Sequence, residues 1–154
     1  MRYWLLKSEP DSFSIDDLAA CAGQRTAWDG VRNYQARNLI RDQMREGDYA
    51  FFYHSSCATP GVVGIVAIVS AAYPDPTQFD RGSKYYDAQS SAEQPRWFVV
   101  DVRLECKLSR LISLSELKKN AHGELRDFAQ LRRGNRLSVV PVSTEQWNFV
   151  RSLE

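Results

Sequence analysis

The sequence predicts an α+β fold in which several short helices alternate with extended segments. Three times a serine ends an extended segment and is followed three residues later by Asp, Glu or Gln, the capping-box pattern that begins a helix. These serines are Ser14, Ser113 and Ser143. Residues 61–72 are almost entirely apolar and rich in β-branched side chains, as expected for a strand that is buried on both faces or closes a barrel.

The N-terminal segment predicts a strand followed by a helix. Residues 3–7 are aromatic and aliphatic and read as a short strand, which ends before Pro10. The capping box of Ser14 with Asp17 predicts a helix that runs to about Cys21.

Two further strands are predicted, and a long connection that follows residues 61–72 precedes the second of them. Residues 49–54 read as one strand, and residues 97–107 alternate apolar with charged side chains, with Cys106 on the apolar side, as in a half-exposed antiparallel strand. Residues 73–95 show no period, and connections of this length are usually functional lids or mobile loops. We expect this segment to fold over the barrel mouth because it carries apolar side chains that water solvates poorly, namely Phe79, Tyr85 and Tyr86.

The stretch 28–37 places aromatic and polar side chains before the start of a helix. Asn33 is a good N-cap, and an apolar stripe at helical spacing predicts a helix over residues 34–45. The N-terminus of a helix can hold an anion such as a phosphate. The stripe consists of Ala36, Leu39, Ile40 and Met44.

The same stretch contains the residue types of a nucleotide pocket. Trp28 and Tyr34 can stack on a planar base, while Asp29 and Asn33 can read the hydrogen-bonding edge of that base. In the alternative interpretation, Trp28 belongs to the core, Gly30 forms a turn and Asn33 only caps the helix.

Charge and cysteine content exclude several classes of protein. The formal net charge is +1, which argues against a protein that coats nucleic acid by bulk electrostatics, so binding requires a local basic patch. The 3 cysteines cannot all pair and form no Cys-x-x-Cys unit, so reduced thiols in a cytoplasmic protein are expected. No apolar run suggests a membrane span. His54 and Cys57 have the only metal-like spacing, and two ligands do not make a zinc site, so we expect neither metal nor cofactor.

Two groups of arginines are candidates for a basic patch. Arg37, Arg41 and Arg45 share one helix face, either as a solvated face or as a track for phosphates. Residues 132–136 lead into a strand over residues 137–142, and their Gly-Asn pair suggests a turn with positive φ that holds three arginines at a corner. That corner is either a solvated turn or a phosphate contact.

Several segments together resemble one known family, the EVE domain of the PUA-like superfamily. Besides stretch 28–37, they are Tyr3-Trp4-Leu5-Leu6-Lys7-Ser8-Glu9-Pro10, Phe51-Phe52-Tyr53-His54-Ser55-Ser56, Tyr73-Pro74-Asp75-Pro76, Tyr85-Tyr86-Asp87 and Arg136-Leu137-Ser138-Val139. The resemblance implies a single domain over residues 1–154, a PUA-like β-barrel of mixed strands flanked by several short helices. One departure is Val140, where a polar residue is expected; if that position lines the pocket, ligand choice differs from that of the family.

The resemblance also implies a function and a set of site residues. It indicates a non-catalytic nucleic-acid-binding module that recognises a modified or flipped-out base, including modified cytosine, in DNA or RNA. The ligand-binding residues that it implies are Lys7, Ser8, Trp28, Asp29, Arg32, Asn33, Tyr34, Tyr53, His54 and Ser138. Arg37, Arg132, Arg133 and Arg136 are expected at the nucleic-acid backbone, with Arg32 and Lys7 also facing phosphate. Trp97 is a weaker candidate for the pocket, because a Trp that begins a core strand is more often packing.

Two other functions remain open from the sequence. A sensor of a nucleotide-like small molecule would use the same pocket without dependence on strand length. An enzyme would use His54 with Ser55, but neighbours in one strand point to opposite faces. The sequence also has no Gly-x-Ser-x-Gly elbow and no phosphate-binding glycine loop. Catalysis is therefore not expected. The oligomeric state is not indicated.

Overall fold

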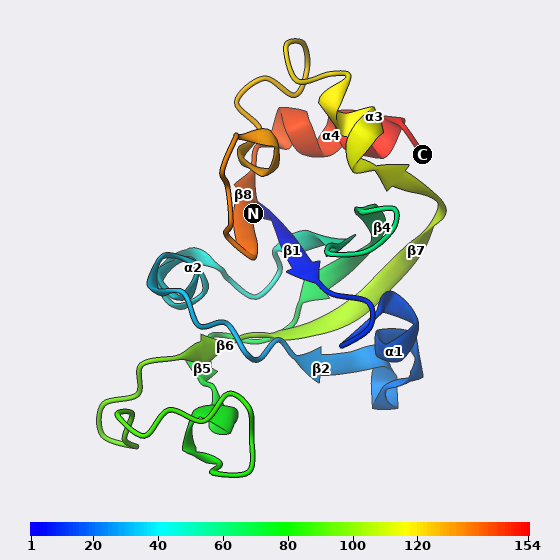
Figure 1. Ribbon diagram of the computed structural model, residues 1–154. Helices are drawn as coiled ribbons and strands as arrows, with labels where there is room; N and C mark the ends of the chain where they lie inside the picture. The colour runs from blue at the N-terminus through cyan, green and yellow to red at the C-terminus, as the bar shows by residue number, and fades with distance from the viewer.

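A mixed six-stranded sheet with the order β2-β7-β4-β3-β1-β8 forms the centre of the molecule (Figure 1). The computed structural model describes residues 1–154. Strands β1 and β3 are parallel, and every other neighbouring pair in this sheet is antiparallel. The strands are β1 Tyr3–Ser8, β2 Arg25–Ala27, β3 Tyr49–His54, β4 Gly61–Ile68, β7 Asp101–Ser113 and β8 Val139–Val142. The sheet curls into a half-barrel flanked by short helices, which confirms the predicted fold class.

Short helices and one small hairpin surround the sheet. The hairpin pairs β5 Tyr73–Pro74 with β6 Phe98–Val99. The α-helices are α1 Ile15–Ala20, α2 Tyr34–Asn38, α3 Leu114–Lys118 and α4 Thr144–Ser152. The other helical segments are the 3₁₀ turns η1 Ala22–Gln24, η3 Pro76–Phe79 and η4 Ala129–Leu131 and the π-helix η2 Leu39–Gln43.

The predicted helix caps are present, one of them only in part. Ser14 and Ser143 form reciprocal capping boxes at the starts of α1 and α4. Ser113 accepts from the N–H of Glu116, but the Glu116 carboxylate binds Arg110 at 2.8 Å instead of returning to the cap. The serine is therefore sufficient to begin α3.

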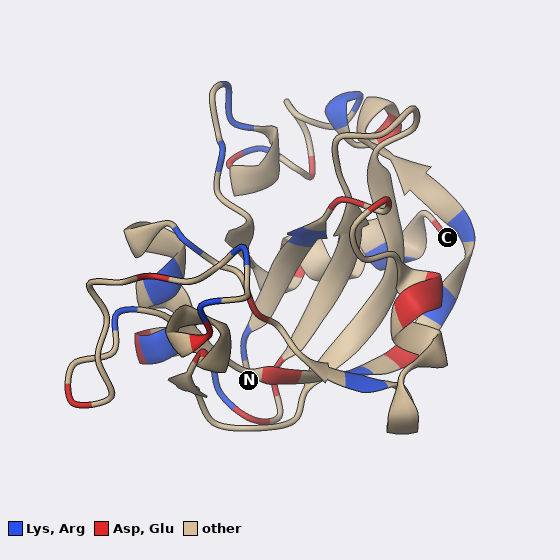
Figure 2. Cartoon of the chain, turned by 60° about the horizontal axis from the view of Figure 1, so that its bottom comes forward, with Lys and Arg blue, Asp and Glu red and all other residues tan.

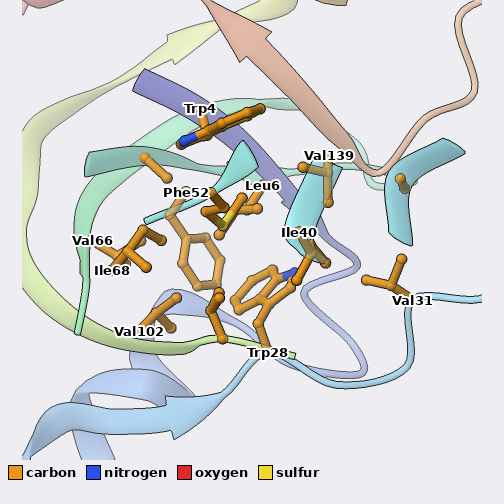
Figure 3. Packing of buried hydrophobic residues seen from close by; sticks show 14 of the residues in the cluster. Trp4, Leu6, Trp28, Val31, Ile40, Phe52, Val66, Ile68, Val102 and Val139 are labelled. Carbon is orange, nitrogen blue, oxygen red and sulfur yellow. The ribbon is translucent and has the colours of Figure 1, made fainter. Parts of the chain in front are cut away.

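Both faces of the sheet are buried, because alternate residues of its central strands point to opposite sides. In β3, Ala50 and Phe52 belong to one apolar cluster, while Phe51 and Tyr53 belong to the other. The first cluster also takes side chains of α1, α2 and η2, and the second takes those of α3 and α4. Figure 3 shows part of the first cluster, with Trp28 pointing into it.

The helix predicted over residues 34–45 begins as expected but ends early. Asn33 caps it through Oδ1, which accepts from the N–H of Ala36 at 3.0 Å. The chain continues as the π-helix and stops at Gln43, not at Arg45. The N–H of Arg45 is donated to the buried carboxylate of Asp48 at 2.9 Å rather than to a helix carbonyl, so the helix cannot extend.

Three strand predictions differ from the structure at their ends. The strand predicted over residues 61–72 ends at Ile68, and β8 begins two residues later than position 137. The segment 97–107 is divided into β6 and β7, and β7 runs on to Ser113. A register shift opposite β4 leaves Glu105 without a partner, and Cys106 is exposed instead of pointing inward.

Charge is mixed over the surface. Figure 2 shows Lys and Arg together with Asp and Glu mainly on the helices, the loops and the periphery of the sheet, while its central strands are mostly free of charge. None of the helices combines the length and the apolar character that crossing a membrane demands.

Candidate functional site

A pocket of about 740 Å³ lies at the C-terminal ends of the parallel strands β1 and β3. Two backbone hydrogen bonds fix its walls. The N–H of Lys7 donates to the carbonyl of Ser138, and the N–H of Ser55 donates to the carbonyl of Ser8, both at 2.9 Å. Segment 26–31, which begins within β2, and residues 84–85 of the long connection also line the pocket. Segments far apart in the sequence therefore meet here because their strands end together.

Trp28 takes part in both the core and the pocket. Its side chain is 7% exposed and meets Phe52 edge-on, with ring centroids 5.4 Å apart, and Phe13 at 6.3 Å. Trp28 also lines the pocket. The two interpretations of this residue are thus compatible, since most of its surface is packed and the remainder faces the pocket.

Gly30 lets the ring of Tyr85 close one side of the pocket. Its φ is +80°, and a Cβ at this position would lie 2.5 Å from Cζ of Tyr85. Tyr85 belongs to the long connection and lines the pocket together with Lys84. The position of Tyr85 thus agrees with the expectation that this connection folds over the mouth, whereas Phe79 and Tyr86 are exposed.

A buried carboxylate joins the connection to stretch 28–37. Asp75 is fully buried and its oxygens accept from the N–H of Gly30 at 3.0 Å, from Nη1 of Arg32 at 3.0 Å and from the N–H and Oγ1 of Thr77 at 2.8 and 2.6 Å. Burial acts to raise the pKa of Asp75, but the hydrogen bonds from Thr77, Gly30 and Arg32 outweigh it and lower the pKa.

Arg32 is fully engaged inside the protein. Besides Asp75, its guanidinium donates to the carbonyl of Tyr85 from Nε at 3.2 Å and from Nη2 at 2.8 Å, to Oγ1 of Thr77 and to the carbonyl of Val31. These bonds use all five N–H groups of the side chain. Arg32 does not line the pocket. We therefore assign it to holding the connection in place rather than to phosphate contact.

None of the charged residues that line the pocket forms an ion pair; these residues are Lys7, Glu9, Asp29, Lys84 and Arg136. Neither the Lys7 ammonium nor the Asp29 carboxylate forms an ion pair or a hydrogen bond to another side chain, although both residues line the pocket. Burial lowers the pKa of Lys7. Loss of water and then the charge of Asp75 raise the pKa of Asp29, against the opposing effects of Arg32, a hydrogen bond from its own backbone N–H and Lys84.

Of the other predicted ligand residues, Ser8 and Ser138 line the pocket, as does Arg136. The Ser8 hydroxyl donates to the carbonyl of Phe13 at 2.5 Å, so it can offer a ligand only an acceptor. Glu9, Ser12, Phe13, Thr26, Ala27, Val31, Ser55 and Ser56 complete the wall and are not among the residues that the sequence predicts.

The structure leaves Asn33, Tyr34, Tyr53 and His54 outside the pocket. Asn33 is used as the cap of α2. Tyr53 is 2% exposed and belongs to the second apolar cluster, as does Val140, so the departure at Val140 does not alter the pocket wall.

Tyr34 forms a stack on the surface. It is 50% exposed and lies on the buried ring of Trp97, with centroids 4.8 Å apart. The guanidinium of Arg37 lies 4.8 Å from the Tyr34 ring and donates to the carbonyl of Arg96 at 2.6 Å. Trp97 therefore packs against neighbouring side chains and does not line the pocket.

A second hollow of about 420 Å³ adjoins the pocket, and we call it the basic groove. Arg136 lines both hollows, and Arg132 and Arg133 line the groove with no ion pair. Gly134 has φ +78°, which confirms the predicted turn. Arg37 is not part of this groove. The groove is lined by Asn33, Gln35, Ala129, Arg132, Arg133, Gly134, Asn135, Arg136 and Leu137.

The residues considered for catalysis or metal binding are not assembled into such a site. Nε2 of His54 accepts from the N–H of Ile15 at 3.1 Å, and burial lowers the pKa of this imidazole. The chain contains no group of three or more His, Cys, Asp or Glu side chains that could hold a metal ion.

Asp75, Lys84 and Tyr85 were not predicted as site residues from the sequence. Asp75 and Tyr85 nevertheless lie in two of the family motifs. Segments 73–76 and 85–87 are motifs of the family that the chain resembles, yet they lie in a connection without a period. Their roles depend on contacts with Gly30 and Arg32, which are more than forty residues away in the sequence.

Comparison with known proteins relates nearly the whole chain to one family. A family model described as "EVE domain" matches residues 2–153. Thymocyte nuclear protein 1 of Gallus gallus is 49% identical, covering 99% of this chain and 68% of the relative. The Homo sapiens protein of the same name is 46% identical, covering 99% of this chain and 73% of the relative.

Solved structures give the same result. The human THYN1 protein in complex with 5-methylcytosine containing DNA has a TM-score of 0.94 and 44% identity, covering 99% of this chain and 97% of that chain. A protein from Pseudomonas syringae has a TM-score of 0.91 and 48% identity, covering 98% of both chains.

Proposed function

Because the chain belongs to the EVE domain family, we propose that it is a non-catalytic module that binds DNA and takes a modified cytosine into the pocket at the ends of β1 and β3. The single observation that carries this proposal is the likeness, at a TM-score of 0.94, to human THYN1 protein in complex with 5-methylcytosine containing DNA. That likeness covers 99% of this chain, so it includes every segment of the pocket.

The dimensions and the lining of the pocket support the proposal. Its volume of about 740 Å³ lies in the range of small-molecule sites, about 300–1,000 Å³. Trp28, Phe13 and Tyr85 give it aromatic walls, on which a base gains about 1–3 kcal/mol of stacking energy. Extruding the base from a duplex costs a few kcal/mol, and this cost falls when the base is already unpaired.

The basic groove supports a role in holding the DNA backbone. Arg132, Arg133 and Arg136 have no acidic partner, and Arg136 connects the groove to the pocket. A base that enters the pocket therefore has guanidinium groups beside it for the adjoining phosphates, which position a strand without reading its sequence. Arg32 is not available in this way, and Arg37 does not line the groove.

The other functions are less well supported. A sensor of free nucleotides would not need the basic groove. An enzyme would need an activated nucleophile or base in the pocket, and His54 is outside it with Nε2 occupied. The cytoplasmic location stays a prediction, since relatives of this chain are named nuclear proteins.

A titration with short oligonucleotides tests the proposal. Single- and double-stranded DNA would carry cytosine, 5-methylcytosine or 5-hydroxymethylcytosine at one position, with RNA of the same sequence and free nucleotides for comparison. We expect tighter binding of DNA with a modified cytosine than of unmodified DNA. Equal affinity for modified and unmodified strands would overturn the proposal, and tighter binding of free nucleotides would favour the sensor.

A blocking substitution locates the binding without disturbing the core. Ser12 is exposed, lines the pocket and forms no side-chain hydrogen bond, so Ser12→Trp should fill the pocket and abolish the preference. Ser12→Ala is the matched control and should retain it. Trp28→Ala is less informative, because removing a packed Trp costs about 3–5 kcal/mol of folding stability.

A further inference from the structure

Among the charged residues that line the pocket without an ion pair, Lys7 and Asp29 carry opposite charges. Lys7 reaches the pocket from the end of β1, and Asp29 from the segment after β2. Neither forms an ion pair, whereas the neighbouring pair Arg32 and Asp75 is joined at 3.0 Å. A ligand that offers Asp29 a donor and Lys7 an acceptor would therefore supply the partners that both groups lack.

The edge of a cytosine offers this combination. 5-Methylcytosine and thymine carry the same methyl group on the same ring, so apolar volume cannot distinguish them. Cytosine presents an amino donor at position 4 and an acceptor at N3, while thymine presents an acceptor at position 4 and a donor at N3. An ionised carboxylate only accepts hydrogen bonds and an ammonium only donates them.

We propose that Asp29 and Lys7 act as an acceptor–donor pair that selects 5-methylcytosine over thymine. The Asp29 carboxylate accepts from the amino group at position 4, and the Lys7 ammonium donates to N3. Thymine would place its O4 against the carboxylate and its N3–H against the ammonium, which leaves buried polar groups unpaired. This inference rests on the proposed function, and it assigns Lys7 to the base rather than to phosphate.

The surroundings of the two groups agree with this role. Asn33, the other candidate for reading a base edge, is used as a helix cap. Burial lowers the pKa of the half-buried Lys7. Asp29 remains an exposed residue that a ligand can reach, and partial loss of water is the largest of the causes that raise its pKa. The charged groups that act on Asp29 are Asp75, Arg32 and Lys84, and two of these already bind each other.

The test compares two single-stranded DNAs that differ at one position, which carries either 5-methylcytosine or thymine. The protein should prefer 5-methylcytosine by at least about tenfold. In Asp29→Asn the ratio should fall towards one, because an amide offers a donor as well as an acceptor. In Lys7→Met the ratio should also fall, since the donor to N3 is lost while the apolar stem is kept.

Matched controls remove the same charges from exposed residues outside the pocket. Glu145→Gln and Lys118→Met should leave the ratio between the two DNAs unchanged, because neither residue lines the pocket. Thermal unfolding of each variant shows whether it is folded. Because Asp29 and Lys7 are substituted separately, one of the two variants can still test the inference if the other does not fold.

The outcomes separate this inference from the proposed function. If the protein prefers 5-methylcytosine over cytosine but binds thymine equally well, the inference is wrong and the proposed function stands. The same holds if both Asp29→Asn and Lys7→Met keep the full ratio. If no modified strand binds better than an unmodified one, both are wrong.

Discussion

At the scale of single residues, the site depends on side chains whose polar atoms are already used inside the protein. The family resemblance implies that Arg32 faces phosphate, yet its hydrogen bonds to Asp75 and to the Tyr85 carbonyl hold stretch 28–37 against the long connection. Gly30 is the residue that permits this approach. Lys7 and Asp29 line the pocket without such partners, as do Glu9, Lys84 and Arg136.

Substituting Gly30→Ala should destabilise the fold strongly. An L residue in the left-handed region costs about 1–2 kcal/mol. The added Cβ would also lie 2.5 Å from the Tyr85 ring, and overpacking costs about a further 1–3 kcal/mol. Urea unfolding monitored by tryptophan fluorescence measures the change.

Gly134→Ala is the control for the backbone contribution. Gly134 has φ +78°, close to that of Gly30, but a Cβ added there would meet no atom within 4 Å. It should lose only about 1–2 kcal/mol. If the two substitutions lowered the free energy of unfolding equally, the close approach of Tyr85 to Gly30 would not contribute to the loss of stability.

At the scale of elements, the connection between β5 and β6 is a fixed wall rather than a free loop. The 3₁₀ turn η3 begins at the cap Asp75, and Gln78 ties it to Trp97 through its side chain, which donates to the Trp97 carbonyl at 2.8 Å. Asp75 then links the connection to stretch 28–37. One carboxylate thus holds both the turn and the pocket wall.

Asp75→Asn should loosen this wall and lower the stability of the protein. An amide can accept fewer of the four hydrogen bonds and leaves Arg32 without its counter-ion, and breaking a buried pair costs about 3–5 kcal/mol. Limited proteolysis between Asp80 and Glu93 should become faster. Asp80→Asn, at an exposed carboxylate of the same segment, should change neither the stability nor the cleavage rate.

The same carboxylate gives a pH dependence with a defined sign. The pKa of Asp75 is lowered in the folded protein, so its contribution to stability is present above the unfolded value of about 3.9 and is lost as pH falls through the folded pKa. Asp75→Asn should remove this part of the acid dependence. Unfolding free energies of the wild type and of Asp75→Asn are compared from pH 6 to about pH 2. If both proteins lose the same stability over this range, Asp75 does not cause the acid dependence.

At the scale of the whole molecule, a net charge of +1 leaves nucleic-acid affinity to local groups. Charges of both signs lie mainly on the helices, the loops and the periphery of the sheet (Figure 2). The basic groove is an exception, since no acidic residue lines it. Binding of a polymer should therefore depend on salt through a few phosphates next to the pocket.

The double substitution Arg132→Ala with Arg133→Ala should weaken the binding of DNA but not that of a free nucleotide. Each phosphate contact contributes about 0.7–0.9 to the slope of log K against log salt, so the slope should become shallower by about 1.4–1.8. Lys118→Ala with Lys119→Ala removes the same charge near α3 and should leave the slope unchanged. An unchanged slope in the arginine variant would exclude the groove as a phosphate site.

The sequence by itself determined the features that depend on neighbours three or four residues away or on a repeated pattern. These include the caps at Ser14, Asn33 and Ser143, the alternation of strands with short helices, and the motifs of the family. Each of them is local, because a capping side chain bonds to the first turn of its own helix.

Only the tertiary structure decided which candidates meet in the pocket. Arg32 is used by Asp75, 43 residues away, and His54 by Ile15, 39 residues away, so two polar side chains that looked available are not. The helix that begins at Tyr34 stops where Asp48 takes the N–H of Arg45. The physical reason is that one hydrogen-bonding group serves few partners, and the fold, not the sequence spacing, brings the competing partners close.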